Sequence, residues 1–253
     1  MPRPHRPKKP DRSEEAEPRH GRRRPADSPT EEPDETTAPA KHGNRPEADG
    51  IDERIAATLR IIGGKFGRRR LKYTGDPRTR PMKDRVREAL FNLVGPSVIG
   101  SHAIDLFAGT GALGLEALSR GAARATFIER HYPTAATIKE NIATLGVEEI
   151  STVRPGDTFL FVRKLPDMGP EPWVVFCSPP YDFYVERADD VRLMIERLMA
   201  AAPPGSKFVI ETDQRFEIES IPTTGEWDVR NYPPARVGIC RLPGPLTDAE
   251  QSL

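Results

Sequence analysis

The chain has 253 residues, of which 38 are Lys or Arg and 38 are Asp or Glu, so its formal net charge is zero. This length allows one large domain or two small ones, and the overall balance gives no sign of a nucleic-acid or membrane partner. The average conceals an uneven distribution. Residues 51–100 carry 12 basic against 5 acidic side chains, whereas residues 101–253 carry 15 against 22. The zero is therefore a cancellation between segments.

Two further classes of protein are excluded by what the chain lacks. No apolar run approaches the roughly 18 residues of a membrane span, and no apolar segment follows the basic N-terminal residues. We therefore expect a cytoplasmic protein with no membrane partner. Cys177 and Cys240 cannot make a disulfide framework and lack the spacing of a zinc site, so they are interpreted as buried small side chains and no metal is expected.

The first 50 residues contain 10 Pro, 11 basic and 11 acidic residues, and no Val, Ile, Leu, Phe, Trp, Tyr or Cys. Such a segment cannot bury enough apolar surface to offset the entropy lost on ordering, so residues 1–50 are predicted to be disordered. Basic residues gather in its first half and acidic ones in its second. A solvated spacer is the favoured interpretation, and weak contact of the basic half with RNA is the alternative.

Residues 51–80 are predicted to form a small basic extension. Within it, LRIIGGKFGRRRLKY over residues 59–73 predicts a β-hairpin whose two short strands flank Gly63-Gly64, with Gly67 as a bend. The segment holds too many cations for a face that packs only on protein.

The main domain is predicted over residues 81–242, with a short tail over 243–253. Pro81 and the spacing of the apolar residues after it predict a helix over 82–94. Apolar runs and helical stretches then alternate, with strands expected at 102–107, 124–129, near Thr152, 173–177 and 206–211, and helices at 112–120, 133–145, 158–165 and 186–201. Two last strands, 226–232 and 235–241, have no helix between them. This order predicts a doubly wound α/β domain, a mostly parallel seven-stranded sheet with an antiparallel edge, whose ligands lie at the carboxyl ends of the strands.

A glycine loop follows the first predicted strand. Residues 108–114, AGTGALG, satisfy G-x-G-x-x-G between a strand and a helix, so a ligand can approach the backbone where the helix begins. Asp105 lies four residues before the first glycine, where a carboxylate would repel a pyrophosphate but accept from an ammonium group. The amino-acid portion of S-adenosylmethionine carries such a group. The candidate cofactor residues of this loop are Asp105, Phe107, Ala108, Gly109, Thr110 and Gly111.

Two more acids follow predicted strands. Glu129 ends the second strand, where Rossmann-type domains place an acid on the ribose hydroxyls. Asp157 follows the third strand and could receive an adenine amino group. An N-cap for the helix from residue 158 is an equally supported role for it.

The fourth predicted strand runs directly into Ser178-Pro179-Pro180-Tyr181. Two prolines fix the backbone and present carbonyl acceptors without amide donors. Ser178 Oγ and the Pro179 carbonyl would accept the two hydrogens of an NH2 group, and Tyr181 would stack on the ring that bears it. The chemistry indicated is a direct displacement in which positioning supplies most of the catalysis.

Taken in order, LRIIGGKFGRRRL, RPMKDRVREALFNLV, DLFAGTGALGLEALSRGA, the acid of FIER and SPPY resemble the RsmD-type methyltransferases over about residues 59–242. The resemblance implies a class I Rossmann-like fold, S-adenosylmethionine as methyl donor, and methylation of a guanine N2 in 16S ribosomal RNA of a partly assembled small subunit. It assigns residues 105–111 to the methionine end of the cofactor, Glu129 to its ribose, Asp157 to its adenine side, and residues 178–181 to the target base.

The chain departs from that family at two places. The family usually has Asp where this chain has Ser178, and a neutral hydroxyl cannot take up the proton that the attacking amine must lose. Met82 and Lys83 replace a Thr-rich pair. The SPPY loop is also similar to that of some cytosine-N4 DNA methyltransferases, which leaves the identity of the base open.

The leading hypothesis is thus an RNA guanine-N2 methyltransferase acting as a monomer. It explains the basic segment, since Lys and Arg neutralise phosphates, and its RNA-binding candidates are Arg60, Lys65, Arg68, Arg69, Arg70, Lys72, Arg80 and Arg85. The alternatives are the same chemistry on DNA (adenine N6 or cytosine N4), another RNA or a protein glutamine, an NAD-binding oxidoreductase, and a non-catalytic RNA-binding protein on a methyltransferase fold.

Overall fold

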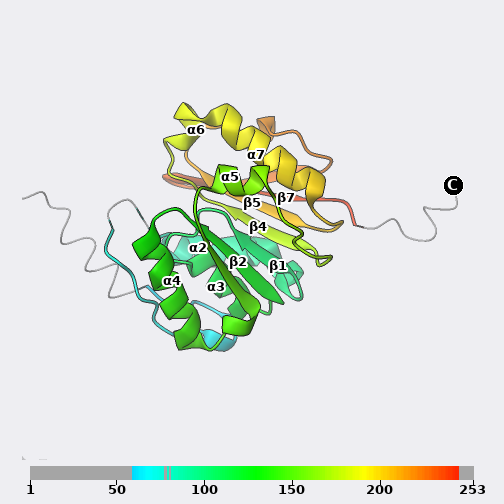
Figure 1. Cartoon of the computed structure of the whole chain (residues 1–253). Helices are drawn as coiled ribbons and strands as arrows, with labels where there is room; N and C mark the ends of the chain where they lie inside the picture. Colours follow the sequence, from blue (N-terminus) through cyan, green and yellow to red (C-terminus); the bar gives the residue numbers. More distant parts are fainter. Residues whose placement is uncertain (1–58, 77–78, 80, 245–253) are drawn as a thin grey trace, which may run out of the picture. The chain divides into compact units, whose positions relative to one another are not determined.

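The computed structural model describes residues 59–76, 79 and 81–244 (Figure 1). The predicted tail over 1–50, the first part of the basic extension, Arg80 and most of the C-terminal tail lie outside these residues.

A seven-stranded sheet forms the centre of the described residues, in the order β3-β2-β1-β4-β5-β7-β6. Five neighbouring strands run parallel: β1 (His102–Asp105), β2 (Arg124–Glu129), β3 (Ser151–Pro155), β4 (Trp173–Cys177) and β5 (Lys207–Thr212). β7 (Ala235–Arg241) is antiparallel to both β5 and β6 (Trp227–Tyr232). The predicted mostly parallel sheet with an antiparallel edge is confirmed.

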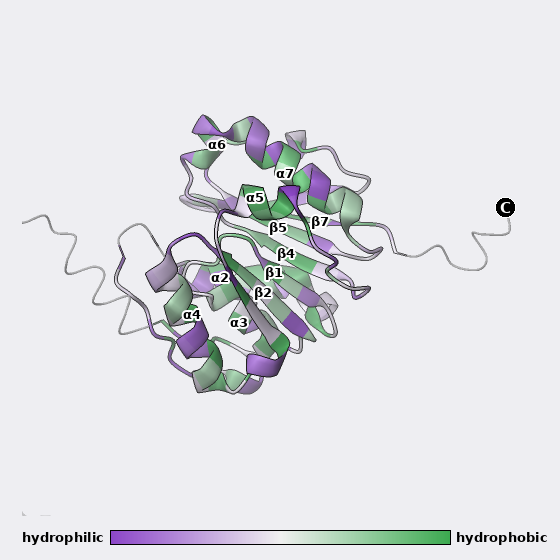
Figure 2. Ribbon diagram, viewed as in Figure 1, coloured by the Kyte–Doolittle hydropathy of each residue, from purple (hydrophilic) through white to green (hydrophobic). Residues whose placement is uncertain are grey.

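Helices cover both faces of this sheet (Figure 1). On one face lie α2 (Asp84–Val94), α3 (Ala112–Ser119) and α4 (Tyr132–Leu145), and on the other α5 (Thr158–Arg163), α6 (Phe183–Glu186) and α7 (Ala188–Ala201). The side chains of β4 alternate between the two cores: Val174 and Phe176 pack toward α2 and α3, while Val175 and Cys177 pack toward α6 and α7. Figure 2 shows apolar residues along the central strands and a mixture of apolar and polar residues in the helices around them.

The predicted boundaries differ from the structure at two helices. The helix expected over 82–94 begins at Asp84, because Lys83 has an extended backbone and Pro81 therefore precedes the first turn. The helix expected over 186–201 begins at Ala188, since Arg187 is non-helical with φ −135° and ψ 32°, and Glu186 instead ends the short preceding helix α6. Both cysteines are buried and unpaired, as expected.

In the basic extension, the antiparallel pairing is shorter than in the predicted hairpin. Backbone hydrogen bonds join Ile61 N to the Arg69 carbonyl and Leu71 N to the Leu59 carbonyl, each at 2.9 Å, around a single bridge. The connection is a 3₁₀ turn, η1 (Gly64–Phe66), instead of a two-residue turn at the glycine pair. The reason is tertiary, because the amides that would continue the ladder bond to a side chain of α3.

That side chain is Glu116, which is fully buried. Its two carboxylate oxygens accept from the amides of Ile62 and Gly63 at 2.7 and 2.8 Å. Gly64 follows with φ +73°, and a Cβ there would lie 1.9 Å from the Ser119 carbonyl oxygen. The turn is thus docked on the last residues of α3.

Candidate active site

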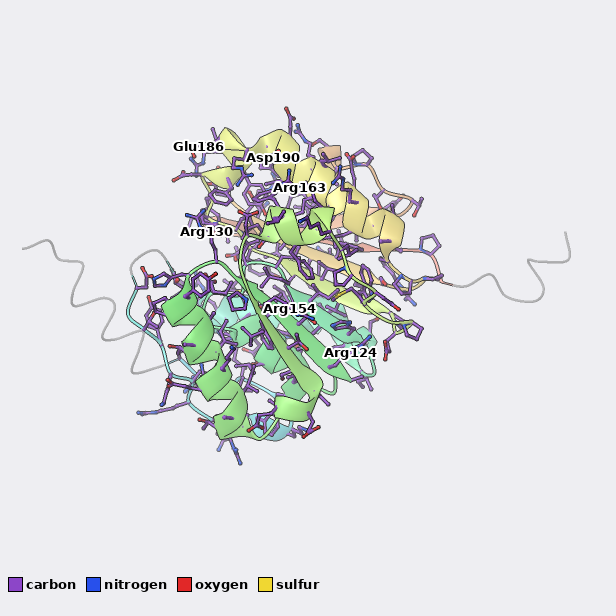
Figure 3. The ribbon with its side chains drawn as sticks, viewed as in Figure 1. Arg124, Arg130, Arg154, Arg163, Glu186 and Asp190 are labelled. Carbon is purple, nitrogen blue, oxygen red and sulfur yellow. The ribbon has the colours of Figure 1, made fainter. Side chains whose placement is uncertain are left out.

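The strand order reverses between β1 and β4, and this switch point is where open α/β sheets bind ligands. β1 lies next to β4 with Asp105 beside Phe176, so the glycine loop after β1 and the SPPY loop after β4 leave the sheet side by side. In Figure 3, Arg124 begins β2 and Arg130 follows its end, which locates the carboxyl edge on the Arg130 side.

Three glycines of the loop after β1 are required for different structural reasons. Gly109 and Gly111 have φ +50° and +75°, a backbone conformation that L side chains rarely adopt. Gly114 lies under β2, where an added Cβ would meet the Phe127 ring at 2.3 Å. Two glycines therefore shape the turn, and the third lets α3 approach the sheet.

Asp105 is buried at the base of this loop. Its Oδ2 accepts from the Gly114 amide at 3.1 Å. Burial raises the pKa of the Asp105 carboxyl to about 7, nearby Glu129 adds to this effect, and the Gly114 hydrogen bond opposes it. A carboxyl in this state gains from a neighbouring cation, so the site suits an ammonium group and disfavours a pyrophosphate.

Glu129 is held against the same loop. Its Oε2 accepts from the Gly109 amide and its Oε1 from the His131 amide, each at 2.7 Å. Each carboxylate oxygen retains a second lone pair, which vicinal hydroxyls of a ribose can use.

The other predicted loop residues line or support this region. The Phe107 ring lies 6.0 Å from that of Phe159 and 6.2 Å from that of Phe183, which joins the loops after β1, β3 and β4 through aromatic contacts. The Ala108 amide donates to the Ile128 carbonyl at 2.9 Å, and Thr110 is buried.

Asp157 caps α5. Its Oδ1 accepts from the Leu160 amide at 2.9 Å, as expected for an N-cap. Its second oxygen and its place at the carboxyl end of β3 are compatible with the adenine contact, which stays a prediction.

The SPPY loop contacts a carboxyl of the neighbouring strand. The Tyr181 hydroxyl donates to Glu211 Oε1 at 3.1 Å, and Ser178 is half-buried at the start of the loop. Pro179 is buried, whereas Pro180 is exposed and its carbonyl accepts from the Phe183 amide at 2.9 Å. The Pro180 carbonyl thus starts α6.

Sequence reasoning missed Glu211. It belongs to β5, which pairs with β4 so that Ile210 lies beside Cys177. The available signal was an acid near the end of a predicted strand, the same signal that identified Glu129. The sequence did not reveal the strand order, and it is the pairing of β5 with β4 that brings this acid to the SPPY loop.

The predicted RNA-binding cations lie in different surroundings. Arg60 pairs with Asp84 at 3.1 Å and Lys72 with Glu140 at 2.8 Å. The remaining described cations of the set are exposed: Lys65, Arg68, Arg69, Arg70 and Arg85. Lys65, Arg68, Arg69 and Arg70 belong to the docked turn or directly follow it. This turn contacts the last residues of α3, whereas the glycine loop lies where α3 begins, about 12 Å away along the helix axis.

Exposed cations also stand at the carboxyl edge itself, and these were missed. Arg130 directly follows Glu129, and Arg154 precedes Pro155, the partner of Glu129 in β3 (Figure 3). Arg163 is exposed at the opposite end of α5 from Asp157. Arg130 and Arg154 each follow or neighbour Glu129, an acid that the sequence had already selected.

Among the described residues, no three His, Cys, Asp or Glu side chains gather as metal ligands. Nor is any helix of that part long and apolar enough to cross a membrane.

Comparison with known proteins gives a consistent set of relatives. The family described as "Conserved hypothetical protein 95" matches residues 59–233. Ribosomal RNA small subunit methyltransferase D of Escherichia coli (strain K12) is 41% identical over 123 residues, which are 49% of this chain and 60% of that protein. The candidate rRNA methyltransferase YlbH of Bacillus subtilis (strain 168) is 36% identical over 123 residues, which are 49% of this chain and 67% of that protein.

The solved structure of yhhF, a candidate methyltransferase of Escherichia coli, superposes with a TM-score of 0.63 at 28% identity. The match covers 73% of this chain and 98% of that one. With the sheet order described above, it confirms the expected Rossmann-like class I methyltransferase fold. In the sequence match, the chain spans about three fifths of the length of the Escherichia coli relative.

Proposed function

The chain belongs to the family described as conserved hypothetical protein 95. Because its relatives include small-subunit rRNA methyltransferases of the RsmD type, we propose that it methylates ribosomal RNA with S-adenosylmethionine. The finer proposal is that the acceptor is the exocyclic N2 of a guanine in 16S rRNA. One observation carries it: a glycine loop with a buried acid and an amine-gripping SPPY loop leave adjacent strands at the switch point.

The donor set of the first loop fits S-adenosylmethionine, which supplies a methyl group bonded to a cationic sulfur. Asp105 would pair with its ammonium group, since burial has made that carboxyl receptive to a cation. Glu129 would accept from the ribose hydroxyls, and Asp157 from the adenine amino group. The backbone of residues 107–111 would lie against the methionine portion.

The second loop would hold the target base. Ser178 Oγ and the Pro179 carbonyl would accept the two hydrogens of the exocyclic amine, which aims the nitrogen lone pair at the methyl carbon. Tyr181 would stack on the base, an interaction worth about 1 to 3 kcal/mol.

RNA outside the target base would be held through its phosphates. We assign this role to two exposed sets of cations, one on the docked turn and one at the carboxyl edge. Because the docked turn contacts the last residues of α3 and the carboxyl edge lies where that helix begins, about 12 Å away along its axis, an RNA that touches both must extend across α3. A partly assembled small subunit presents such an extended RNA surface. We expect a cytoplasmic monomer to act on it.

The test uses purified protein, tritiated S-adenosylmethionine and small-subunit particles from cells that lack the activity. We expect label in 16S rRNA and recovery of N2-methylguanosine after digestion. Label in DNA alone, or recovery of another methylated base, would contradict the proposal. DNA of the same length and mixed sequence serves as the control substrate.

A further inference from the structure

We propose that Arg68 is a dedicated contact to an RNA phosphate, which the docked turn holds in a left-handed backbone conformation that favours glycine. This inference rests on the proposed function and deepens it, because it names one contact between the protein and its RNA. Arg68 is one of several exposed cations in the basic segment. Among the described residues, it is the only one other than glycine with a positive φ.

The residues after η1 form a type II β-turn. The Arg69 amide donates to the Phe66 carbonyl at 3.1 Å. The two central residues are Gly67, with φ −47° and ψ 138°, and Arg68, with φ 70°. Type II turns require a positive φ at the second central position, which glycine usually occupies because a Cβ disfavours that conformation. In this turn an arginine occupies it.

The glycine of this turn stands one place earlier, where φ does not require it. The φ of Gly67 is open to every L residue, and glycine is favoured there by close packing, since an added Cβ would lie 3.3 Å from the Gly64 carbonyl oxygen. An arginine at position 68 therefore costs folding free energy that glycine would not cost. A strained residue that a fold retains points to a function for its side chain.

The turn cannot relax to relieve this strain, because the segment is fixed on both sides of it. Before the turn, the buried Glu116 carboxylate accepts from the amides of residues 62 and 63. After it, the buried Asn141 side chain pairs with the amide and the carbonyl of Lys72 at 2.7 and 3.0 Å. Helices α3 and α4 thus hold the segment at two points. RNA would meet a preformed turn, which lowers the conformational entropy lost on binding.

The cations beside Arg68 are engaged differently. Lys65 Nζ and Arg69 Cζ lie 4.7 and 5.7 Å from the centre of the Phe66 ring, so that ring restrains both side chains. Arg68 is exposed, and no carboxylate in the described part of the chain pairs with it. A guanidinium is planar and carries five donors, which suits the oxygens of a phosphate.

Thermal unfolding tests the strain. Asparagine tolerates the left-handed conformation and glycine adopts it freely, so Arg68→Asn and Arg68→Gly should raise the Tm by about 1 to 4 °C. Arg70→Gly is the matched control, an exposed arginine two residues later without a positive φ. It should lower the Tm, because glycine gives the unfolded chain more freedom. A Tm at or below that of the wild type in both Arg68 variants would overturn the claim that Arg68 is retained at a folding cost.

RNA binding is measured by fluorescence anisotropy with a labelled fragment of 16S rRNA, since phosphate contacts do not depend on the base sequence. Arg68→Asn should weaken binding about five- to eightfold at about 100 mM salt. It should also reduce the slope of log affinity against log salt by about 1. Arg68→Lys keeps the charge and should preserve the slope. Arg197→Ala removes an exposed cation from α7, on the other face of the sheet, and should change neither quantity.

The more stable variant should thus be the weaker binder. An Arg68→Asn slope equal to that of the wild type would overturn the proposal, as would equal losses in Arg68→Asn and Arg197→Ala, or no binding of the fragment by the wild-type protein. A wild-type protein that binds RNA through Arg68 but labels no small-subunit particle would instead count against the proposed methylation and leave the contact supported.

Discussion

Asp105 and Glu211 are two carboxyl groups at the same edge of one sheet, and burial raises the pKa of both. Their partners differ. Asp105 accepts from a backbone amide of α3, whereas Glu211 accepts from the Tyr181 hydroxyl of a loop that follows another strand. A cation that binds beside a buried carboxyl can ionise it, whereas a carboxyl that a tyrosine hydroxyl occupies holds that side chain in place. Similar burial thus accompanies different contacts, and the Asp105 carboxyl is the one we expect to respond to a cationic ligand.

The largest expected effect concerns the hydroxyl proposed to hold the target amine. Ser178→Ala should lower the single-turnover rate by about 10²- to 10³-fold, since it removes an acceptor that positions that amine. Cofactor affinity should change less than twofold in calorimetry, because the glycine loop is untouched. A variant that keeps the wild-type rate would remove Ser178 from the mechanism.

The next effect concerns the ring that holds the base. Tyr181→Ala should raise the KM for RNA about five- to hundredfold, which corresponds to the stacking energy of one base. Tyr181→Phe is the matched control, since it keeps the ring and loses only the bond to Glu211. Equal losses in both variants would show that the hydroxyl matters and stacking does not.

The Asp105 side of the comparison can be tested through pH. Because the Asp105 pKa of about 7 lies above its unfolded value, the carboxyl is mostly protonated at pH 6 and ionises as the pH rises. Affinity for S-adenosylmethionine should therefore increase roughly eightfold between pH 6 and 7.5, measured by calorimetry. The free energy of unfolding of the ligand-free protein should fall over the same rise.

Asp105→Asn supplies the control for that prediction. It should bind the cofactor more weakly at pH 7.5 and lose the dependence of affinity on pH. A variant whose affinity still rises through pH 7 would place the titrating group elsewhere.

The smallest effects are expected outside both sites. Replacing Arg68, Arg69 and Arg70 by Ala should reduce the slope of log affinity for RNA against log salt by about 2, with the rate at saturating RNA unchanged. Arg130 and Arg154 form the comparison set at the carboxyl edge. If only the edge set alters the slope, the docked turn does not face the RNA.

The local features of the glycine loop could be predicted from the sequence because its acid, glycines and helix start are consecutive. Asp105 is tied to Gly114 only nine residues later. The N-cap role of Asp157 was equally accessible, since its partner is three residues away. The hairpin turn was predicted wrongly in detail, because Glu116, more than 50 residues later, binds the amides that a tight turn would have paired.

The sequence alone determined the α/β class, the antiparallel edge and the positions of the glycine loop and the SPPY loop after their strands, since each depends on periodicity or on residues adjacent in the chain. Only the tertiary structure decided which acid contacts the SPPY loop and where the basic turn lies. Strand order is set by packing over the whole sheet and is not encoded in any short segment. It places β5 next to β4, so Glu211 accepts a hydrogen bond from Tyr181, a residue 30 positions earlier in the chain.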